Sequence, residues 1–166
     1  MGPLVHVRPL QADDIPALAL NEQLTDFCTR ALERRDWTTK SIRVFVTEVP
    51  AFSATETSQL AGFTLVGLGY PPYFPALDES VGQMYIASIE IREAFRRRGY
   101  ATAVLEFFKQ EAQTLGLDVL RCECEKGWRV TLYECVGFVP VEYKGTSPEY
   151  PESHQMLELW FTKNNE

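Results

Sequence analysis

The sequence predicts an α/β fold in which one mixed β-sheet carries helices on both faces. Two observations favour this class. An apolar strand over 85–91 runs through a short turn into an amphipathic helix that begins at Gly99. Strands and helices alternate early in the chain, and a pair of strands lies near its end. A mixed sheet is the arrangement that accommodates both patterns.

The first half of the chain is predicted to hold a helix and a hairpin. Asp13 is expected to cap one helix with an apolar face of Leu18, Leu20, Leu24 and Phe27. A half-buried strand follows, indicated by the alternating residues Ile42, Val44 and Val46, and 60–68 is its antiparallel partner.

Two segments of this half are less regular. The polar stretch Arg34-Arg35-Asp36 is compatible with a second short helix. The segment 69–75 is rich in proline and aromatic residues, which excludes a central strand. We interpret this segment as a surface loop, either a rigid connection or a lid over a groove.

The second half contains the clearest helix of the chain. Its apolar residues follow helical spacing, and Gly116 is a natural stop: Ala101, Val104, Leu105, Phe108, Ala112 and Leu115. Beyond it we expect a strand over 118–125, a short helix over about 128–136, and strands over 138–143 and 156–161. The apolar last strand would bury an exposed edge in a dimer.

Composition bounds the class of protein. The 166 residues are 45% hydrophobic, which suits one compact domain. No run of 18 apolar residues and no leader pattern occurs, so we expect a cytoplasmic protein that does not bind membranes. A formal net charge of −7 disfavours nucleic acid as a partner, although arginines cluster locally at 96–98.

The cysteines are expected to be reduced and mostly buried. Cys122 and Cys124 point the same way on one strand and lack the geometry for a bridge, and the others are Cys28 and Cys135. A zinc site would need Cys-x-x-Cys pairs or nearby histidines, and the two histidines, His6 and His154, are far apart in sequence. We therefore expect no metal.

The turn before the long helix has the properties of a phosphate-binding site. The first N–H groups of a helix have no intrahelical acceptor and lie at the positive end of its dipole. Gly99 lets a ligand approach the backbone because it has no Cβ. A plain turn with a solvated arginine run is the alternative. Neither a Gly-x-Gly-x-x-Gly dinucleotide turn nor a Gly-x-x-x-x-Gly-Lys-Ser/Thr loop occurs.

Two motifs resemble the GCN5-related N-acetyltransferase (GNAT) family. Residues 96–101 read Arg-Arg-Arg-Gly-Tyr-Ala, which is similar to the acetyl-CoA signature Gln/Arg-x-x-Gly-x-Gly/Ala. Residues 132–138 read Leu-Tyr-Glu-Cys-Val-Gly-Phe and resemble the family's Leu-Tyr-x-x-x-Gly-Phe. The resemblance extends loosely to residues 5–10 and 13–16, which look like the family's opening strand and helix, and it implies a single N-acetyltransferase domain over 1–166.

The resemblance also implies how the cofactor is held. The sheet is expected to be mostly antiparallel, with six or seven strands and a central pair that splays apart to admit acetyl-CoA. The pantetheine arm would add to the strand edge through backbone groups of Ile89 and Ile91. The full set implied for cofactor binding is Ile89, Glu90, Ile91, Arg96, Arg97, Arg98, Gly99, Tyr100, Ala101, Thr102, Lys126 and Tyr133.

The second motif departs from the family just before its tyrosine. Lys126 and Arg129 stand where an Asn and an Ala are usual, so the contact that the Asn makes with the cofactor arm is open. The two cations would instead serve the cofactor phosphates.

The resemblance assigns the chemistry to Tyr133, which would donate a hydrogen bond or proton to the departing CoA thiolate. The base is harder to assign, because the family's usual positions hold Tyr85 and Ala87 here. Glu123 shares a strand face with Arg121, a position that is Glu in some members. We therefore predict Glu123 as base or amine anchor, with a solvated edge charge as the alternative. His154 is a further candidate from a loop.

These features imply an N-acetyltransferase that moves an acetyl group from acetyl-CoA to a primary amine by direct attack. No Cys–His pair is recognisable as nucleophile and base, which agrees with direct transfer. The alternatives are a non-catalytic acyl-CoA-binding module and an acyltransferase for protein N-termini. The acceptor would be a small-molecule or peptide amine, and the protein a monomer or homodimer.

Overall fold

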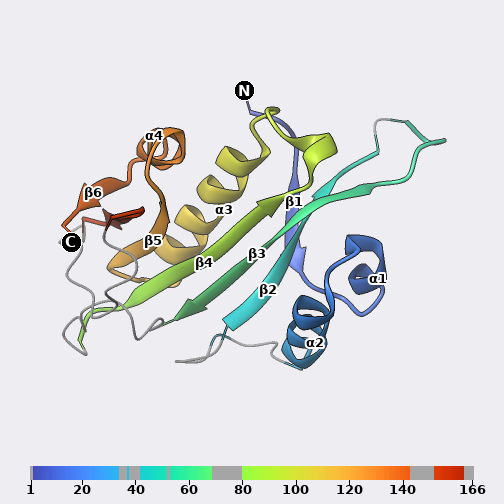
Figure 1. Ribbon diagram of the computed structural model, residues 1–166, viewed down its shortest axis with the longest axis horizontal. Helices are drawn as coiled ribbons and strands as arrows, with labels where there is room; N and C mark the ends of the chain where they lie inside the picture. Colours follow the sequence, from blue (N-terminus) through green and yellow to red (C-terminus); the bar gives the residue numbers. More distant parts are fainter. Residues whose placement is uncertain are drawn as a thin grey trace.

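The computed structural model describes residues 2–33, 37, 42–51, 53–68, 80–142 and 152–162. They form one seven-stranded sheet in the order β1-β2-β3-β4-β5-β7-β6 (Figure 1). The strands are β1 (His6–Pro9), β2 (Ile42–Val49), β3 (Gln59–Leu68), β4 (Gln83–Ile91), β5 (Val119–Glu125), β6 (Val139–Val141) and β7 (His154–Trp160). The β4–β5 pair is parallel and the other described pairs are antiparallel. The predicted mixed, mostly antiparallel sheet is therefore confirmed.

Helices cover both faces of this sheet, as predicted. They are α1 (Asp14–Leu18), α2 (Glu22–Ala31), α3 (Tyr100–Thr114) and α4 (Trp128–Glu134), with a 3₁₀ turn at Glu93–Phe95. Phe45 of β2 packs in one core with Phe108 of α3, whereas its neighbour Val44 packs in another core with Cys28 of α2. Because successive strand residues point to opposite faces, α3 and α2 lie on opposite sides of the sheet.

The single helix expected after Asp13 is instead two helices. The helix α1 ends at Leu18, and its C-cap residue Ala19 has a φ of 51°, in the left-handed region. The side chain of Asn21 then accepts a hydrogen bond of 2.9 Å from the N–H of Leu24 and caps α2. Asp13 makes no side-chain capping bond. Helical spacing of the apolar residues hid this break, since it continues across both helices.

The hairpin of β2 and β3 is confirmed, with Val44 opposite Leu65 and Val46 opposite Phe63. The strand β2 is buried on both faces, however, and the prediction that it is half-buried was wrong. The reason is that β2 lies inside the sheet with α2 on one side and α3 on the other. The segments 34–36 and 69–75 lie outside the described residues.

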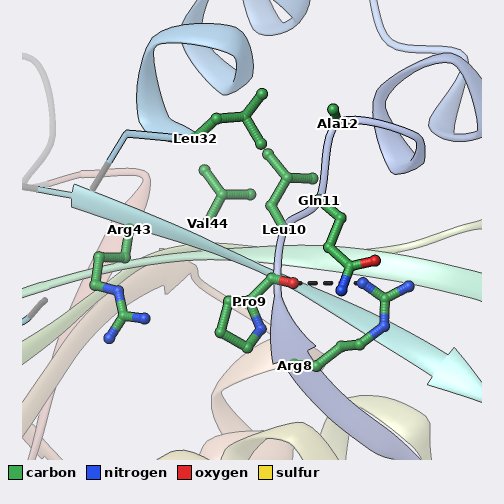
Figure 2. A pocket seen from close by; sticks show the side chains of 8 residues that line it. All are labelled: Arg8, Pro9, Leu10, Gln11, Ala12, Leu32, Arg43 and Val44. Carbon is green, nitrogen blue, oxygen red and sulfur yellow. Dashed lines mark hydrogen bonds between the residues drawn. The ribbon is translucent and has the colours of Figure 1, made fainter. Parts of the chain in front are cut away.

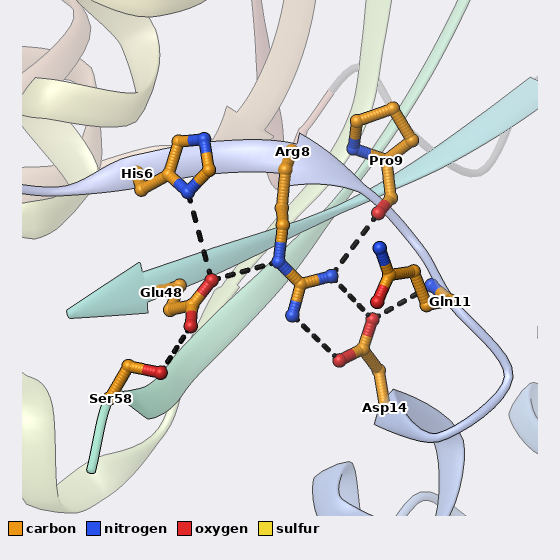
Figure 3. Close-up of polar contacts among 7 residues, drawn as sticks. All are labelled: His6, Arg8, Pro9, Gln11, Asp14, Glu48 and Ser58. Atoms are coloured by element: carbon orange, nitrogen blue, oxygen red, sulfur yellow. Dashed lines mark hydrogen bonds and ion pairs between the residues drawn. The ribbon is translucent and has the colours of Figure 1, made fainter. Parts of the chain in front are cut away.

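A polar network ties β1 to α1 and β2 (Figure 3). Two nitrogens of Arg8 each donate a 2.8 Å bond to the carboxylate of Asp14, and its Nε donates one of the same length to Glu48. The backbone N–H of Gln11 also donates to Asp14, at 2.7 Å, and Ser58 donates to Glu48. This bidentate pairing fixes the start of the chain against the sheet.

The last strand lies inside the sheet. The strand β7 pairs with β5 on one side and β6 on the other, so the outer strands are β1 and β6. The expectation that the last strand exposes an edge was therefore wrong, because β6 pairs antiparallel with its residues 156–158.

The predicted cysteine pattern is confirmed, since Cys28, Cys122 and Cys124 are buried thiols and Cys135 is an exposed one. Within the described residues, no helix has the length and apolar composition needed to cross a membrane.

Candidate functional site

The two parallel strands of the sheet separate after four paired residues. Pairing between β4 and β5 runs from Gln83 with Val119 to Ile86 with Cys122. Leu65 of β3 then pairs with Ser88 and Val66 with Ile86, so Ala87 is an extra residue that bulges from β4. From Ala87 onward, β4 keeps its partner β3 but has no described partner on the β5 side. The expected splayed pair is present, and we call it the split.

The split exposes backbone groups of two β4 residues. The N–H of Arg92 bonds to the carbonyl of Ala61 on the β3 side, at 2.7 Å. Backbone groups alternate in direction along an antiparallel strand, so those of Ile89 and Ile91 point toward the split. The Ile91 carbonyl accepts a 2.8 Å bond from Arg96 Nε. The backbone of Glu90 points toward β3, so its exposed side chain is the part of this residue that remains available.

Gly62 keeps this half of β4 close to β3. It pairs with Ile91, and a Cβ at this position would collide with the backbone carbonyl of Glu90. The strand that carries the open backbone groups is therefore set by a close approach that only glycine permits.

The turn that follows β4 positions the start of α3 at the open end of the split. Gly99 is the N-cap residue of α3 and has a φ of 80°, and Arg97 also has a positive φ of 61°. The side chain of Tyr100 packs inward against Phe95, so it offers a backbone N–H and not its ring. The N–H groups of Tyr100, Ala101 and Thr102 precede the first intrahelical bond, which Ala103 makes to Gly99.

The basic residues of the turn are all exposed: Arg96, Arg97 and Arg98. Lys126 and Arg129, on the other side of the split, are exposed too, but Arg129 is 3.2 Å from the carboxylate of Glu125. Since β4 and β5 are parallel, the segments that follow them leave the same end of the sheet. The predicted cationic residues thus flank this end from two sides.

Tyr133 lies in the last turn of α4 on the α3 side of the sheet. Its ring packs edge-on against Phe138, with centroids 5.5 Å apart, and it belongs to the same core as Cys122 and Cys124. Burial, followed by these two thiols, raises the pKa of its phenol far above the ordinary value of 10. The phenol therefore stays neutral. Since no described group accepts a hydrogen bond from its hydroxyl, this hydroxyl remains able to donate one.

Glu123 lies on the opposite face of the sheet, beside Tyr85. The Tyr85 hydroxyl is 3.5 Å from Glu123 Oε1, at the outer limit of a hydrogen bond. Burial raises the pKa of the Glu123 carboxyl, while His154 and the Tyr85 hydroxyl oppose this rise. Burial also raises the pKa of Tyr85, so this phenol is a neutral donor as well. A carboxylate with a raised pKa is a stronger base than a solvated one.

The structure places three residues around Glu123, and the sequence alone had put one of them, Arg121, on its face. Tyr85 is one, although it occupies the strand position where the family often has its base. Arg121 is another: it is buried and paired with Glu158, so it takes no part as a base. His154 begins the strand β7 opposite Glu125 and was wrongly expected in a loop. The alternation of side chains along β5 places Arg121 and Glu123 on one face. Only the register of β4, β5 and β7 shows that Tyr85 and His154 lie beside them.

A cavity of about 600 Å³ lies on the other half of the sheet (Figure 2). It is lined by the end of β1 and residues that follow it, by Leu32 after α2, and by Arg43 and Val44 of β2. The cavity shares no residue with the split, so the candidate site is defined by the open strand edge and not by this hollow.

The sequence matches the family model described as Acetyltransferase (GNAT) family over residues 17–138, which is more than half of the chain. The chain belongs to the GNAT family. A search of curated proteins finds no significant match.

Solved structures of similar fold agree with membership of the GNAT family. Arabidopsis thaliana NAA60 with a bisubstrate analogue has a TM-score of 0.66 and 14% identity, covering 96% of this chain and 100% of that one. The Escherichia coli ribosomal-protein-S18-alanine N-acetyltransferase has a TM-score of 0.61 and 17% identity, covering 98% and 99%. The Vibrio cholerae spermidine N-acetyltransferase with CoA and spermine has a TM-score of 0.61 and 15% identity, covering 94% and 95%. At these identities the likeness establishes the fold of this GNAT protein.

Proposed function

We propose that this protein is an acetyl-CoA-dependent N-acetyltransferase that transfers the acetyl group to a primary amine by direct attack. The observation that carries the proposal is the split, which has backbone groups of Ile89 and Ile91 directed toward it on one edge, with the Ile91 carbonyl bonded to Arg96, and the Gly99 turn at its end. Structures of the same fold are described with CoA or acetyl-CoA bound, including NAA60 with acetyl-CoA. The two family motifs follow the two strands of the split in the chain: residues 96–101 come after β4, and residues 132–138 come after β5.

The residues at the split match the successive chemical groups of acetyl-CoA, the acetyl donor. The N–H groups that begin α3 suit the pyrophosphate, since they lie at the positive end of a 15-residue helix. Exposed arginines 97 and 98, together with Lys126, supply further positive charge for phosphates. The amide-rich pantetheine arm suits a strand edge, because it can exchange backbone hydrogen bonds with Ile89 and Ile91.

In this proposal Glu123 removes the proton of the acceptor amine. An alkyl ammonium has a pKa near 10.4, so a neutral amine must be generated before it attacks the thioester carbon. Glu123 accepts that proton directly or through water, and its burial, which raises its pKa, makes it a better acceptor than an exposed carboxylate. The new C–N bond forms as the C–S bond breaks, and the sulfur leaves as a thiolate.

Tyr133 acts on that leaving sulfur. Its high pKa disfavours complete proton transfer to a thiolate whose conjugate acid has a pKa near 8.5. Donation of a hydrogen bond to the developing negative charge avoids this cost and stabilises the transition state. We therefore assign Tyr133 as the hydrogen-bond donor to the thiolate, with solvent as the final source of its proton.

The acceptor is a small-molecule or peptide amine. Structures of similar fold include a ribosomal-protein alanine acetyltransferase and a polyamine acetyltransferase, so both classes belong in the first screen. The test is release of CoA thiol from acetyl-CoA with panels of polyamines, amino acids and short peptides. Thiol release with at least one amine, lost in Tyr133→Phe, supports the enzyme. Binding of acetyl-CoA without thiol release above background for any amine would favour a non-catalytic acyl-CoA-binding module.

A further inference from the structure

A buried arginine lies beside the proposed base on the same strand. Arg121 and Glu123 are two residues apart on β5, so their side chains share the face opposite α3, about 7 Å apart along the strand. Arg121 is 2% exposed, and an arginine side chain is long enough to reach a carboxylate at that spacing. A pair between them would hold the carboxylate that must accept the proton.

The register of the sheet gives this guanidinium another partner. Glu158 of β7 lies directly across from Arg121, and its Oε1 is 3.3 Å from Arg121 Nη2. On the β4 side, Arg121 Nη1 donates a 3.1 Å bond to Gln83 Oε1. The residue across from Glu123 is instead Met156, which is apolar and buried. The cation is thus drawn away from Glu123 on both sides.

Glu158 is itself held in place. Its second carboxylate oxygen accepts a 2.7 Å bond from the indole N–H of Trp160, two residues along β7. One oxygen of Glu158 therefore faces Arg121 while the other is anchored to the ring. This arrangement fixes the direction in which the guanidinium is pulled.

We propose that Glu158 is a positioning residue for the proposed base, because it holds the Arg121 guanidinium away from Glu123. The inference rests on the role of Glu123 proposed above. Among described residues, the charged or titratable groups around Glu123 come from β4, β5 and β7: Tyr85, Arg121, Glu125, His154 and Glu158.

The groups that influence the pKa values of Glu123 and Arg121 agree with the view that these two residues have separate partners. Besides burial, His154 and Tyr85 are the groups that influence the pKa of Glu123, and Arg121 is influenced by Glu158 and Tyr85. If Glu158 lost its charge, the buried guanidinium would lose the carboxylate that lies across from it on β7, and Glu123 is the nearest carboxylate on its own strand. An opposite charge at close range lowers a carboxyl pKa by roughly one to three units. The base would then be weaker.

The test compares Glu158→Gln with the parent in two measurements. Carbon-13 NMR of glutamate-labelled protein, with Glu123→Gln used to assign the signal, follows the titration of Glu123 without substrate. The pH profile of kcat/KM follows the reaction. We expect Glu158→Gln to move the Glu123 titration down by roughly one to three pH units. The rate at neutral pH should fall, by up to the roughly 10²- to 10⁴-fold that general-base catalysis contributes.

Two further variants separate positioning from loss of charge or of structure. Glu125→Gln removes a carboxylate two residues beyond Glu123 without releasing Arg121, so it should not reproduce the large downward shift. The double variant Arg121→Gln/Glu158→Gln leaves two amides that can bond to each other, and it should return the titration to the parent value. An unshifted titration in Glu158→Gln, or a shift that persists in the double variant, overturns the proposal.

If Glu158→Gln does not fold, Arg121→Gln alone decides the question. The proposal requires that this variant leave the Glu123 titration nearly unchanged, because the guanidinium is already held elsewhere. A marked rise would show that Arg121 acts on Glu123 in the parent and would overturn the proposal. A Glu123 titration that shifts as expected in Glu158→Gln, with an unaltered pH–rate profile, supports positioning by Glu158 but overturns Glu123 as the base.

Discussion

Replacing Gly99 by aspartate should abolish acetyl-CoA binding while the protein stays folded. At a φ of 80°, a residue with a Cβ costs roughly 1 to 2 kcal/mol, and the new Cβ would also lie 3.3 Å from Pro3 Cδ. For a domain of this size, each kcal/mol lowers the melting temperature by about 2 to 4 °C, so the variant should melt about 2 to 8 °C lower. The new carboxylate would also repel the phosphates from the N–H groups of α3.

The assay is thermal unfolding with and without acetyl-CoA. At 100 times its dissociation constant, a ligand selective for the folded state adds about 2.7 kcal/mol, which should raise the parent's melting temperature by about 5 to 11 °C. Gly116→Asp is the matched control, because Gly116 follows the other end of α3 with a φ of 69° and has open space around its Cβ position. It should lose similar stability yet keep the acetyl-CoA shift. A full shift in Gly99→Asp would refute the phosphate assignment.

Three further outcomes are expected. Tyr133→Phe should keep acetyl-CoA affinity, measured by calorimetry, and lower kcat by roughly 10²- to 10⁴-fold, whereas an equal loss of binding would make this residue structural. Glu123→Gln should lower turnover and move the pH–rate profile upward, toward the amine's own titration near 10, and a profile identical to the parent's would exclude Glu123 as base. Although burial raises the pKa of Asp14, bonds from Arg8 and from the Gln11 N–H lower it below the ordinary 3.8. The ionised carboxylate therefore stabilises the fold above that pH, and its contribution is lost as the pH falls below it. Urea unfolding at pH 6 and pH 3 should show a smaller acid-induced loss in Arg8→Gln than in the parent.

Local signals made the Gly99 turn and the long helix predictable. Gly99 and Gly116 bracket an apolar face with helical spacing, and α3 occupies that span. The break between α1 and α2 is also local, but Asn21 as a cap was hidden by apolar residues that keep helical spacing across it. A capping residue is decisive only when the chain is already known to turn there.

Other features depend on register, which one strand cannot encode. That Glu123 and Arg121 share a face follows from strand parity, but whether they pair with each other depends on what lies across from them. Glu158 and Met156 take those places because β7 inserts between β5 and β6. Nothing in the spacing of these residues specifies that insertion, since it is set by the packing of the whole sheet.

The contact between Arg96 and the Ile91 carbonyl bears on how the protein avoids self-association. A strand edge with open backbone groups can recruit a strand from another molecule, and proteins protect such edges with charged side chains. Here the guanidinium covers an outward carbonyl of β4, and the exposed charges of Glu90 and Arg92 lie on either side of Ile91. The strand that is open enough to receive an extended ligand is thereby discouraged from pairing with a second copy of the chain.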